Sequence, residues 1–183
     1  MSRFVKLAAG VDTLPVMLEL CRADHLWDAN PARRLYDGTP HAAMRDIWVR
    51  FRPEAEIAGP KSYKEEYRCT NWPAWHALPS LRPLVRALKN QVDAVELGSI
   101  LITRLPTGAA ILPHSDKGSW AAEWFNCKGH VTLAGAADVR CGEDTVTMER
   151  GDVFTFDNLI EHDVRTVGDA ARVALIVSMR CEP

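Results

Sequence analysis

The pattern of hydrophobic and polar residues changes at about residue 98, from mixed helical and strand-like spacing to short β-rich runs. After Ser80 the apolar residues recur at helical spacing, at Leu81, Leu84, Val85, Leu88 and Val92. Ser80 directly precedes this apolar face, and serine is a favoured residue at helix N-caps. The pattern predicts an amphipathic helix that begins after Ser80.

The first half of the chain has a mixed pattern. Residues 14–20 are mostly apolar and follow Asp12 and Thr13, either of which suits a helix start, so one or two helical turns are expected there. Residues 46–51 alternate apolar with polar, as a half-buried strand does. This half is therefore predicted to contain both helices and at least one strand.

After Gly98 the chain consists of short β-rich runs separated by turn signals. The predicted strands are residues 99–105, 130–134, 145–148, 153–156 and 172–179, and the turns lie at 106–108, 141–144, 150–152 and 167–169. Many short strands at this spacing are typical of a β-barrel or a β-sandwich.

The fold class expected from these patterns is α+β with a mainly β core. A length of 183 residues suits one domain, so we predict a single domain over residues 1–183. Within it, residues 1–97 form a helical or mixed support region and residues 98–183 form the β core. No internal repeat, low-complexity segment or linker is visible.

Composition excludes several classes of protein. Hydrophobic residues make up 47% and charged residues 25% of the chain, which is typical of globular proteins. The net charge of -2 gives no clear signal for nucleic-acid binding, although a local basic groove stays open. Asp12, Pro15 and Glu19 interrupt the N-terminal apolar runs, so we expect neither a signal peptide nor a membrane span.

The five cysteines are odd in number and scattered, and no two of them have CxxC spacing. This pattern suggests neither a disulfide framework nor a zinc site. Reduced thiols fit best, and we therefore expect a cytoplasmic protein.

The candidate chemistry centres on His114, Asp116 and His162. A histidine and a carboxylate two residues apart on a strand point to the same side, so His114 and Asp116 can bind one ion. The distant His162 can complete a three-ligand face, because residues 161–164 begin a new strand after the one at residues 153–156. Two imidazoles and a carboxylate suit Fe(II), Mn(II), Co(II) or Zn(II). An HxD triplet is also common by chance, and a lone histidine is often structural.

Arg172 strengthens the metal interpretation because it opens an apolar strand, RVALIV. An arginine that faced the interior there would be a costly unpaired charge. A bound dicarboxylate would satisfy it through a bidentate contact. The alternative is a surface arginine at the start of the strand.

The segment from about residue 99 to 180 resembles the Fe(II)/2-oxoglutarate-dependent oxygenases, in particular their aspartyl/asparaginyl β-hydroxylase-like branch. The resemblance rests on FDNLIEHDV at 156–164 followed by RVALIV at 172–177, on LPTG and ILPH at 105–114, and on KGHVTL at 128–133. It covers a little under half of the chain. The resemblance implies a double-stranded β-helix, a jelly-roll or cupin-like fold, buttressed by N-terminal helices.

The resemblance also implies roles for individual residues. His114, Asp116 and His162 would bind the metal. Four residues would bind the 2-oxoglutarate cosubstrate: Arg172 would clamp its distal carboxylate with help from Thr103, and His130 and Lys128 would contact its other carboxylate. The family more often has arginine at the position of Lys128. Animal members of this branch have glycine where this chain has Asp116, which argues against transferring their substrate.

The implied activity is that of a dioxygenase that uses Fe(II), 2-oxoglutarate and O2, most simply a hydroxylase of an amino acid, protein side chain or small metabolite. Decarboxylation of 2-oxoglutarate to succinate would accompany it. One alternative is another cupin-type metalloenzyme, because Gly108 and His114-x-Asp116 have the spacing of a first cupin motif. A non-catalytic domain that senses a carboxylate or a metal is a second alternative.

The partner expected for the enzyme is a small-molecule or peptide substrate. Trp120 and Trp124 follow the HxD motif closely and are candidates for a lid that excludes water or stacks on substrate. Packing in the core is an equally good interpretation of both. Arg104, next to Thr103, is a candidate contact for an anionic substrate.

Overall fold

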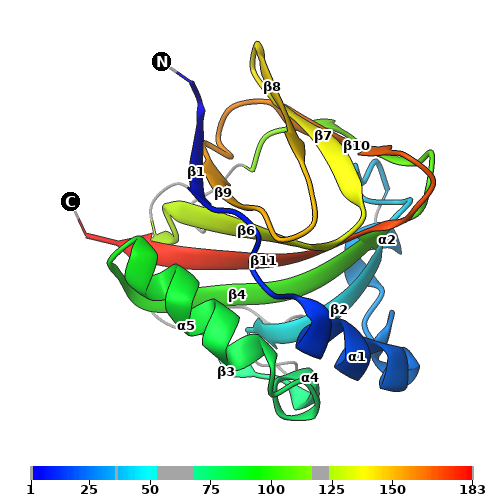
Figure 1. The fold of residues 1–183 in the computed structure, drawn as a ribbon, viewed down its shortest axis with the longest axis vertical. Coiled ribbons are helices and arrows are strands. Elements are labelled where there is room, and N and C mark those ends of the chain that lie inside the picture. Colours follow the sequence, from blue (N-terminus) through cyan, green and yellow to red (C-terminus); the bar gives the residue numbers. More distant parts are fainter. Residues whose placement is uncertain (1, 36, 53–67, 117–123, 183) are drawn as a thin grey trace.

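Two antiparallel β-sheets face each other and form the centre of the molecule (Figure 1). The computed structural model describes residues 2–35, 37–52, 68–116 and 124–182. The larger sheet has the strand order β1-β9-β6-β11-β4-β2-β3, and the smaller one has the order β5-β10-β7-β8. This is the predicted double-stranded β-helix, and helices from the first half of the chain support it.

The strands and helices have the following bounds. The larger sheet consists of β1 (Phe4–Ala8), β2 (Arg45–Phe51), β3 (Thr70–Asn71), β4 (Ala94–Leu105), β6 (Cys127–Ala134), β9 (Val153–Phe156) and β11 (Arg172–Cys181). The smaller sheet consists of β5 (Ala110–His114), β7 (Ala136–Cys141), β8 (Asp144–Met148) and β10 (His162–Val167). The helices are α1 (Leu14–Arg22), η1 (Asp24–Leu26), α2 (Ala32–Leu35), α4 (Pro73–Ala77) and α5 (Leu81–Gln91).

The predicted strands after Gly98 are confirmed, with some extended at their ends. The structure adds β5 and β7 to this region. Before Gly98 it adds β1, which pairs with β9 at the edge of the larger sheet. Glycines with positive φ occupy the predicted turns at Gly108, Gly142, Gly151 and Gly168, where a side chain would strain the backbone.

Helix α5 confirms the predicted amphipathic helix and packs against the outer face of the larger sheet (Figure 1). Leu81, Val85 and Leu88 are buried. Ser80 occupies the N-cap position, but its side chain does not cap the helix. Its hydroxyl donates instead to Glu19 of α1, over 2.6 Å, and so ties the two helices together.

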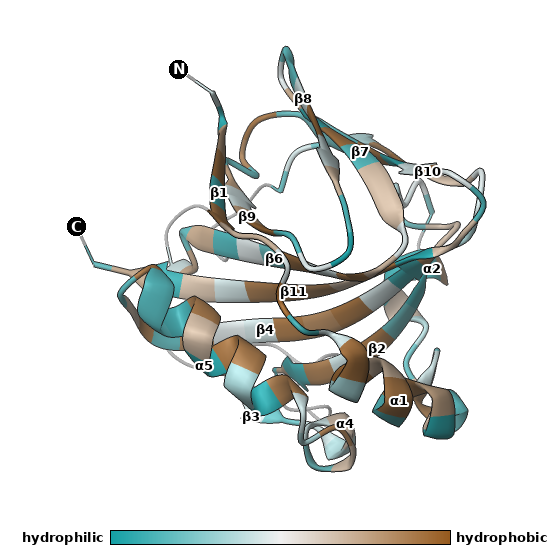
Figure 2. Cartoon of the chain, in the orientation of Figure 1, coloured by the Kyte–Doolittle hydropathy of each residue, from teal (hydrophilic) through white to brown (hydrophobic). Residues whose placement is uncertain are grey.

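The two faces of the larger sheet have different partners, and β11 shows this most clearly. Val173, Leu175 and Val177 belong to the core between the sheet and the helices. Arg172, Ile176 and Ser178 line a cavity on the other face, between the two sheets. Because successive strand residues point to opposite faces, one strand contributes to both the core and the cavity. Figure 2 shows hydrophobic residues, in brown, along the middle of β11 and of its neighbour β4, as a strand that contributes to this core requires.

A second core fills the space between the two sheets next to this cavity. It is built from residues of both sheets, among them Ile111, Val139, Phe154, Phe156 and Val164. This core holds the ends of β5 and β10 against the larger sheet, and these ends carry the candidate metal ligands.

Among the described helices, none combines the length and apolar character that crossing a membrane requires.

Candidate metal centre

The fold brings His114, Asp116 and His162 to one point. His114 is the last residue of β5 and His162 is the first of β10, and the two are directly paired across these strands. One ligand atom from each of the three side chains lies within 4.8 Å of the others. The pairing of β5 with β10 thus places His162 next to His114, although the two residues are far apart in the sequence.

Backbone carbonyls orient both histidines. Nδ1 of His114 lies 2.8 Å from the carbonyl oxygen of Leu112, and Nδ1 of His162 lies 2.9 Å from that of Ile160. A ring that donates from Nδ1 presents an unprotonated Nε2, which is the form that binds a metal. Burial lowers the pKa of His162, which favours this neutral form.

Asp116 is held in its ionised form. Burial by itself would raise the pKa of Asp116, but the ammonium of Lys128, the nearby His162 and a hydrogen bond from Asn158 lower it overall. Asn158 donates from Nδ2 to Asp116 Oδ2 over 3.0 Å, and its carbonyl oxygen accepts from the backbone N–H of Asp116. Lys128 contacts the same Oδ2, while Oδ1 lies 3.8 Å from His114 Nε2.

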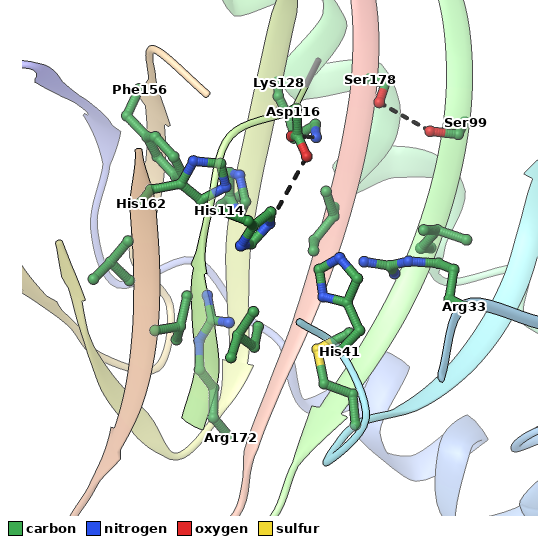
Figure 3. Close-up of a pocket in the computed structure, with 17 residues that line it drawn as sticks. Arg33, His41, Ser99, His114, Asp116, Lys128, Phe156, His162, Arg172 and Ser178 are labelled. Carbon is green, nitrogen blue, oxygen red and sulfur yellow. Dashed lines mark hydrogen bonds and ion pairs between the residues drawn. The ribbon is translucent and has the colours of Figure 1, made fainter. Parts of the chain in front are cut away.

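Arg172 lies in the cavity beside this triad (Figure 3). Its side chain is almost completely buried, with 2% exposed. Within the part of the chain that the structure describes, Nε and Nη2 of Arg172 have no hydrogen-bond partner. Burial lowers the pKa of Arg172 to about 10. A buried, unpaired guanidinium is a strong site for an anion.

His130 lies in the same cavity and is also short of partners. Its ring stacks on Phe156 with centroids 4.8 Å apart, and its Nε2 has no hydrogen-bond partner among the described residues. Burial, followed by the charges of Arg172 and Lys128, lowers the pKa of His130 well below its usual value. At neutral pH it is an uncharged hydrogen-bonding group that faces the cavity.

The cavity also contains residues that the sequence analysis did not identify. Arg33 from α2 and His41 from the following loop line it, and so do Ser99 and Ser178. The ring of His41 lies edge-on to that of His114, with centroids 4.8 Å apart. Burial, then Arg33 and His114, lower the pKa of His41 to about 3. Arg33 and His41 belong to no recognisable motif, and only the tertiary fold brings them to the triad.

Some predicted site residues lie elsewhere. Thr103 is buried on β4 and shares the strand face of Leu101, which lines the cavity, but it is not itself a lining residue. Arg104, the next residue, is exposed and lines a groove on the other side of the sheet, together with Leu20 and Trp27. Arg104 is therefore not brought to the triad.

The two tryptophans of the predicted lid cannot both be placed. Trp124 donates from Nε1 to Glu96 over 3.2 Å, and the guanidinium of Arg180 lies 4.1 Å from its ring centroid. Trp124 is not among the residues that line the cavity. Trp120 falls outside the described residues.

Comparison with known proteins identifies a family. A family model described as aspartyl/asparaginyl beta-hydroxylase matches residues 65–181. No curated protein matches the chain. Among solved structures, an oxidoreductase of the 2OG-Fe(II) oxygenase family from Burkholderia pseudomallei superposes with a TM-score of 0.51 at 17% identity, covering 75% of this chain and 67% of that one. This similarity supports the fold.

Two other solved structures match smaller parts of the chain. A predicted oxalate decarboxylase from Thermotoga maritima has a TM-score of 0.39 at 19% identity, covering 52% of this chain and 73% of that one. A conserved protein of unknown function from Streptococcus pyogenes has a TM-score of 0.36 at 22% identity, covering 46% of this chain and 66% of that one. The chain thus spans about two thirds of the length of several of these structures.

Proposed function

The chain belongs to the aspartyl/asparaginyl β-hydroxylase family, and from this premise we propose that it is an Fe(II)- and 2-oxoglutarate-dependent dioxygenase. The reaction proposed is hydroxylation of an amino acid, protein side chain or small metabolite, coupled to decarboxylation of 2-oxoglutarate to succinate. The observation that carries the proposal is Arg172, a buried guanidinium with unpaired nitrogens in the same cavity as the His114, Asp116 and His162 cluster.

Two features of the cluster fit a divalent metal. The Nδ1 atoms of His114 and His162 are engaged by backbone carbonyls, so each ring has its Nε2 available as a ligand. The carboxylate of Asp116 is ionised, and its negative charge would be balanced by the metal. Two histidines and one carboxylate leave other coordination positions open for cosubstrate and O2. Bound iron and 2-oxoglutarate would supply the oxidising chemistry.

The cavity offers a matching set of groups for 2-oxoglutarate. Arg172 would take the distal carboxylate in a bidentate contact, which would give partners to its unpaired nitrogens. His130 would offer its unpaired Nε2, and Lys128 its ammonium, to the other carboxylate. Thr103 of β4, which lies on the same face of the larger sheet as Arg172, would assist it. The apolar residues between the sheets, such as Phe156 and Val164, exclude water from this region.

Anaerobic titration of the full chain with Fe(II) and then 2-oxoglutarate tests the proposal. We expect the weak visible charge-transfer band of the chelated pair to appear in the parent and to vanish in His114→Ala. Arg172→Gln should weaken the response to 2-oxoglutarate while keeping metal binding. Arg104→Gln is a matched control, because this arginine lies on the other face of the sheet.

Absence of the band from folded parent protein, or a parent-like band in His114→Ala, would overturn the proposal. A band without succinate formation under O2, across candidate substrates and in their absence, would instead support a non-catalytic sensor. Metal binding without any response to 2-oxoglutarate would favour another cupin-type metalloenzyme, in which Arg172 has no evident role.

A further inference from the structure

Arg33 places a second arginine in the cavity, on a different wall from Arg172. It comes from α2 and lines the cavity together with His41 (Figure 3). Figure 3 shows Arg33 and Ser99 on one side of the cavity and His162 on the opposite side. Arg33 lies close enough to His41 to influence its pKa, as His114 does, whereas Arg172 influences His130. The two arginines therefore serve different parts of the cavity.

Asp46 holds Arg33 in place. Nη1 of Arg33 donates to Oδ2 of Asp46 over 3.3 Å, and Asp46 is itself buried on β2 with 5% exposed. A monodentate contact uses one of the five N–H groups of a guanidinium, so Arg33 keeps donors for a ligand. The side chain of Arg33 is 22% exposed, so it is ordered by Asp46 yet accessible from the cavity.

The charges of the cavity are unbalanced. Its described lining residues include three permanent cations, Arg33, Lys128 and Arg172, but only one carboxylate, Asp116. In the proposed function, the two negative charges of 2-oxoglutarate offset the metal, and Asp116 offsets one cation. The cavity as a whole then keeps a net positive charge even after Asp46, the partner of Arg33, is counted. Low-dielectric surroundings strengthen its attraction for an anion.

Two hydroxyl groups add hydrogen-bonding capacity on the floor of the cavity. The Oγ atoms of Ser99 and Ser178 lie 2.9 Å apart and are both buried. Ser178 is paired across the sheet with Lys128. One hydroxyl of such a pair donates to the other, which leaves the second proton free for a ligand. Ser99 thus lies on the same side of the cavity as Arg33, and Ser178 lies beside Lys128 (Figure 3).

We infer that Arg33 binds the primary substrate, and that this substrate is a small carboxylic acid whose carboxylate contacts Arg33 while the rest extends across Ser99 and Ser178 toward the triad. The anion contact that the sequence suggested for Arg104 thus falls to Arg33. The inference rests on the proposed function, because it assigns Arg172 to 2-oxoglutarate and leaves Arg33 for the substrate.

Calorimetry on the full chain tests this inference without turnover. The protein, loaded with Zn(II) and 2-oxoglutarate, is titrated with amino acids, 2-hydroxy acids and short aliphatic acids, each paired with its carboxamide. We expect at least one acid to bind at least about tenfold more tightly than its amide, since a contact to a charged group is worth at least that much. The same acid should increase succinate formation by the Fe(II) protein.

Variants of two neighbouring arginines locate the contact. Arg33→Gln should weaken binding of that acid by about 10- to 100-fold, remove most of the acid-over-amide preference and keep the affinity for 2-oxoglutarate. Arg33→Lys should restore part of the preference. Arg34→Gln is the control, because Arg34 contacts Asp28 and does not line the cavity. Arg33→Gln with Asp46→Asn removes the carboxylate left unpaired, should the single variant be unstable.

The possible failures are distinguishable. A parent protein without the Fe(II) and 2-oxoglutarate band overturns the proposed function and this inference together. A parent with the band that binds no acid, or binds acids and amides equally, overturns only this inference. A normal acid preference in folded Arg33→Gln or in the double variant also overturns it.

Discussion

Replacing Arg172 by methionine should stabilise the ligand-free protein and abolish its stabilisation by 2-oxoglutarate. Burial lowers the pKa of Arg172 from its ordinary value to about 10. This difference corresponds to a free-energy cost of about 3 kcal/mol for keeping the guanidinium charged in the folded state. Methionine keeps the length and flexibility of the side chain without the charge.

The sign of the effect follows from proton linkage. Between the folded pKa near 10 and the higher ordinary pKa of arginine, the unfolded chain binds more protons, so the free energy of unfolding rises with pH across that window. Below pH 10 the guanidinium is charged in both states and the full penalty applies. At pH 7 the Arg172→Met variant should therefore gain up to about 3 kcal/mol, or several degrees in Tm for a chain of this size.

Thermal unfolding at pH 7, with Zn(II) present throughout and 2-oxoglutarate added or withheld, measures both effects. The parent should gain about 2.7 kcal/mol at 100 times the dissociation constant for 2-oxoglutarate, whereas Arg172→Met should gain almost nothing. Arg104→Met is the control and should respond like the parent. A lower Tm for Arg172→Met without ligand, combined with a normal response to 2-oxoglutarate, would refute the reasoning.

Three further variants test Asp116 in the site and two contacts at helix α5. Asp116→Asn should lower Tm at pH 7, because Lys128 loses its partner. The folded pKa of Asp116 is lowered, so the carboxylate stabilises the folded parent above about pH 4. The difference in Tm between parent and variant should therefore persist above that pH and shrink as the pH falls further. In the same variant, calorimetric affinity for Zn(II) should fall at least about tenfold, and an unchanged affinity would argue against Asp116 as a ligand. Gly129→Ala should lower the free energy of unfolding, measured with denaturant, by about 1–3 kcal/mol, since a Cβ there would lie 2.5 Å from a methyl carbon of Leu88. Adding Leu88→Ala should relieve the clash. The double variant should therefore lose less free energy of unfolding than the two single variants lose together. Ser80→Ala should lower the free energy of unfolding by about 1 kcal/mol, because the hydrogen bond to Glu19 is lost. The same loss for Ser80→Ala in a Glu19→Ala background as in the parent would contradict this.

The sequence predicts the second half of the fold better than the first. Strands β9 and β11 are recognisable as short apolar runs bounded by turn signals, and helix α5 is recognisable by its helical period. Strand β1 was not predicted, since its residues 4–8 show little alternation and become a strand only by pairing with β9. Edge pairing of this kind depends on a distant partner that a local pattern does not contain.

The sequence also predicts some residues of the candidate site better than others. The HxD motif, His162 and Arg172 stand out because each breaks an otherwise apolar or strand-like run. The groups that hold these side chains do not stand out: the carbonyl of Ile160 lies next to Nδ1 of His162, and the amide of Asn158 donates to Asp116. Backbone acceptors are invisible in a sequence because every residue has one.

The two-sided character of β11 has a consequence for how this protein tolerates change. Val173, Leu175 and Val177 belong to the core between the larger sheet and the helices, whereas Arg172, Ile176 and Ser178 line the cavity. Substitutions in the core set would alter the stability of the protein, and those in the cavity set would alter the ligand binding of the proposed function. Stability and ligand binding can therefore change independently along one strand. Deletion of a single residue would exchange the sets and destroy both properties at once.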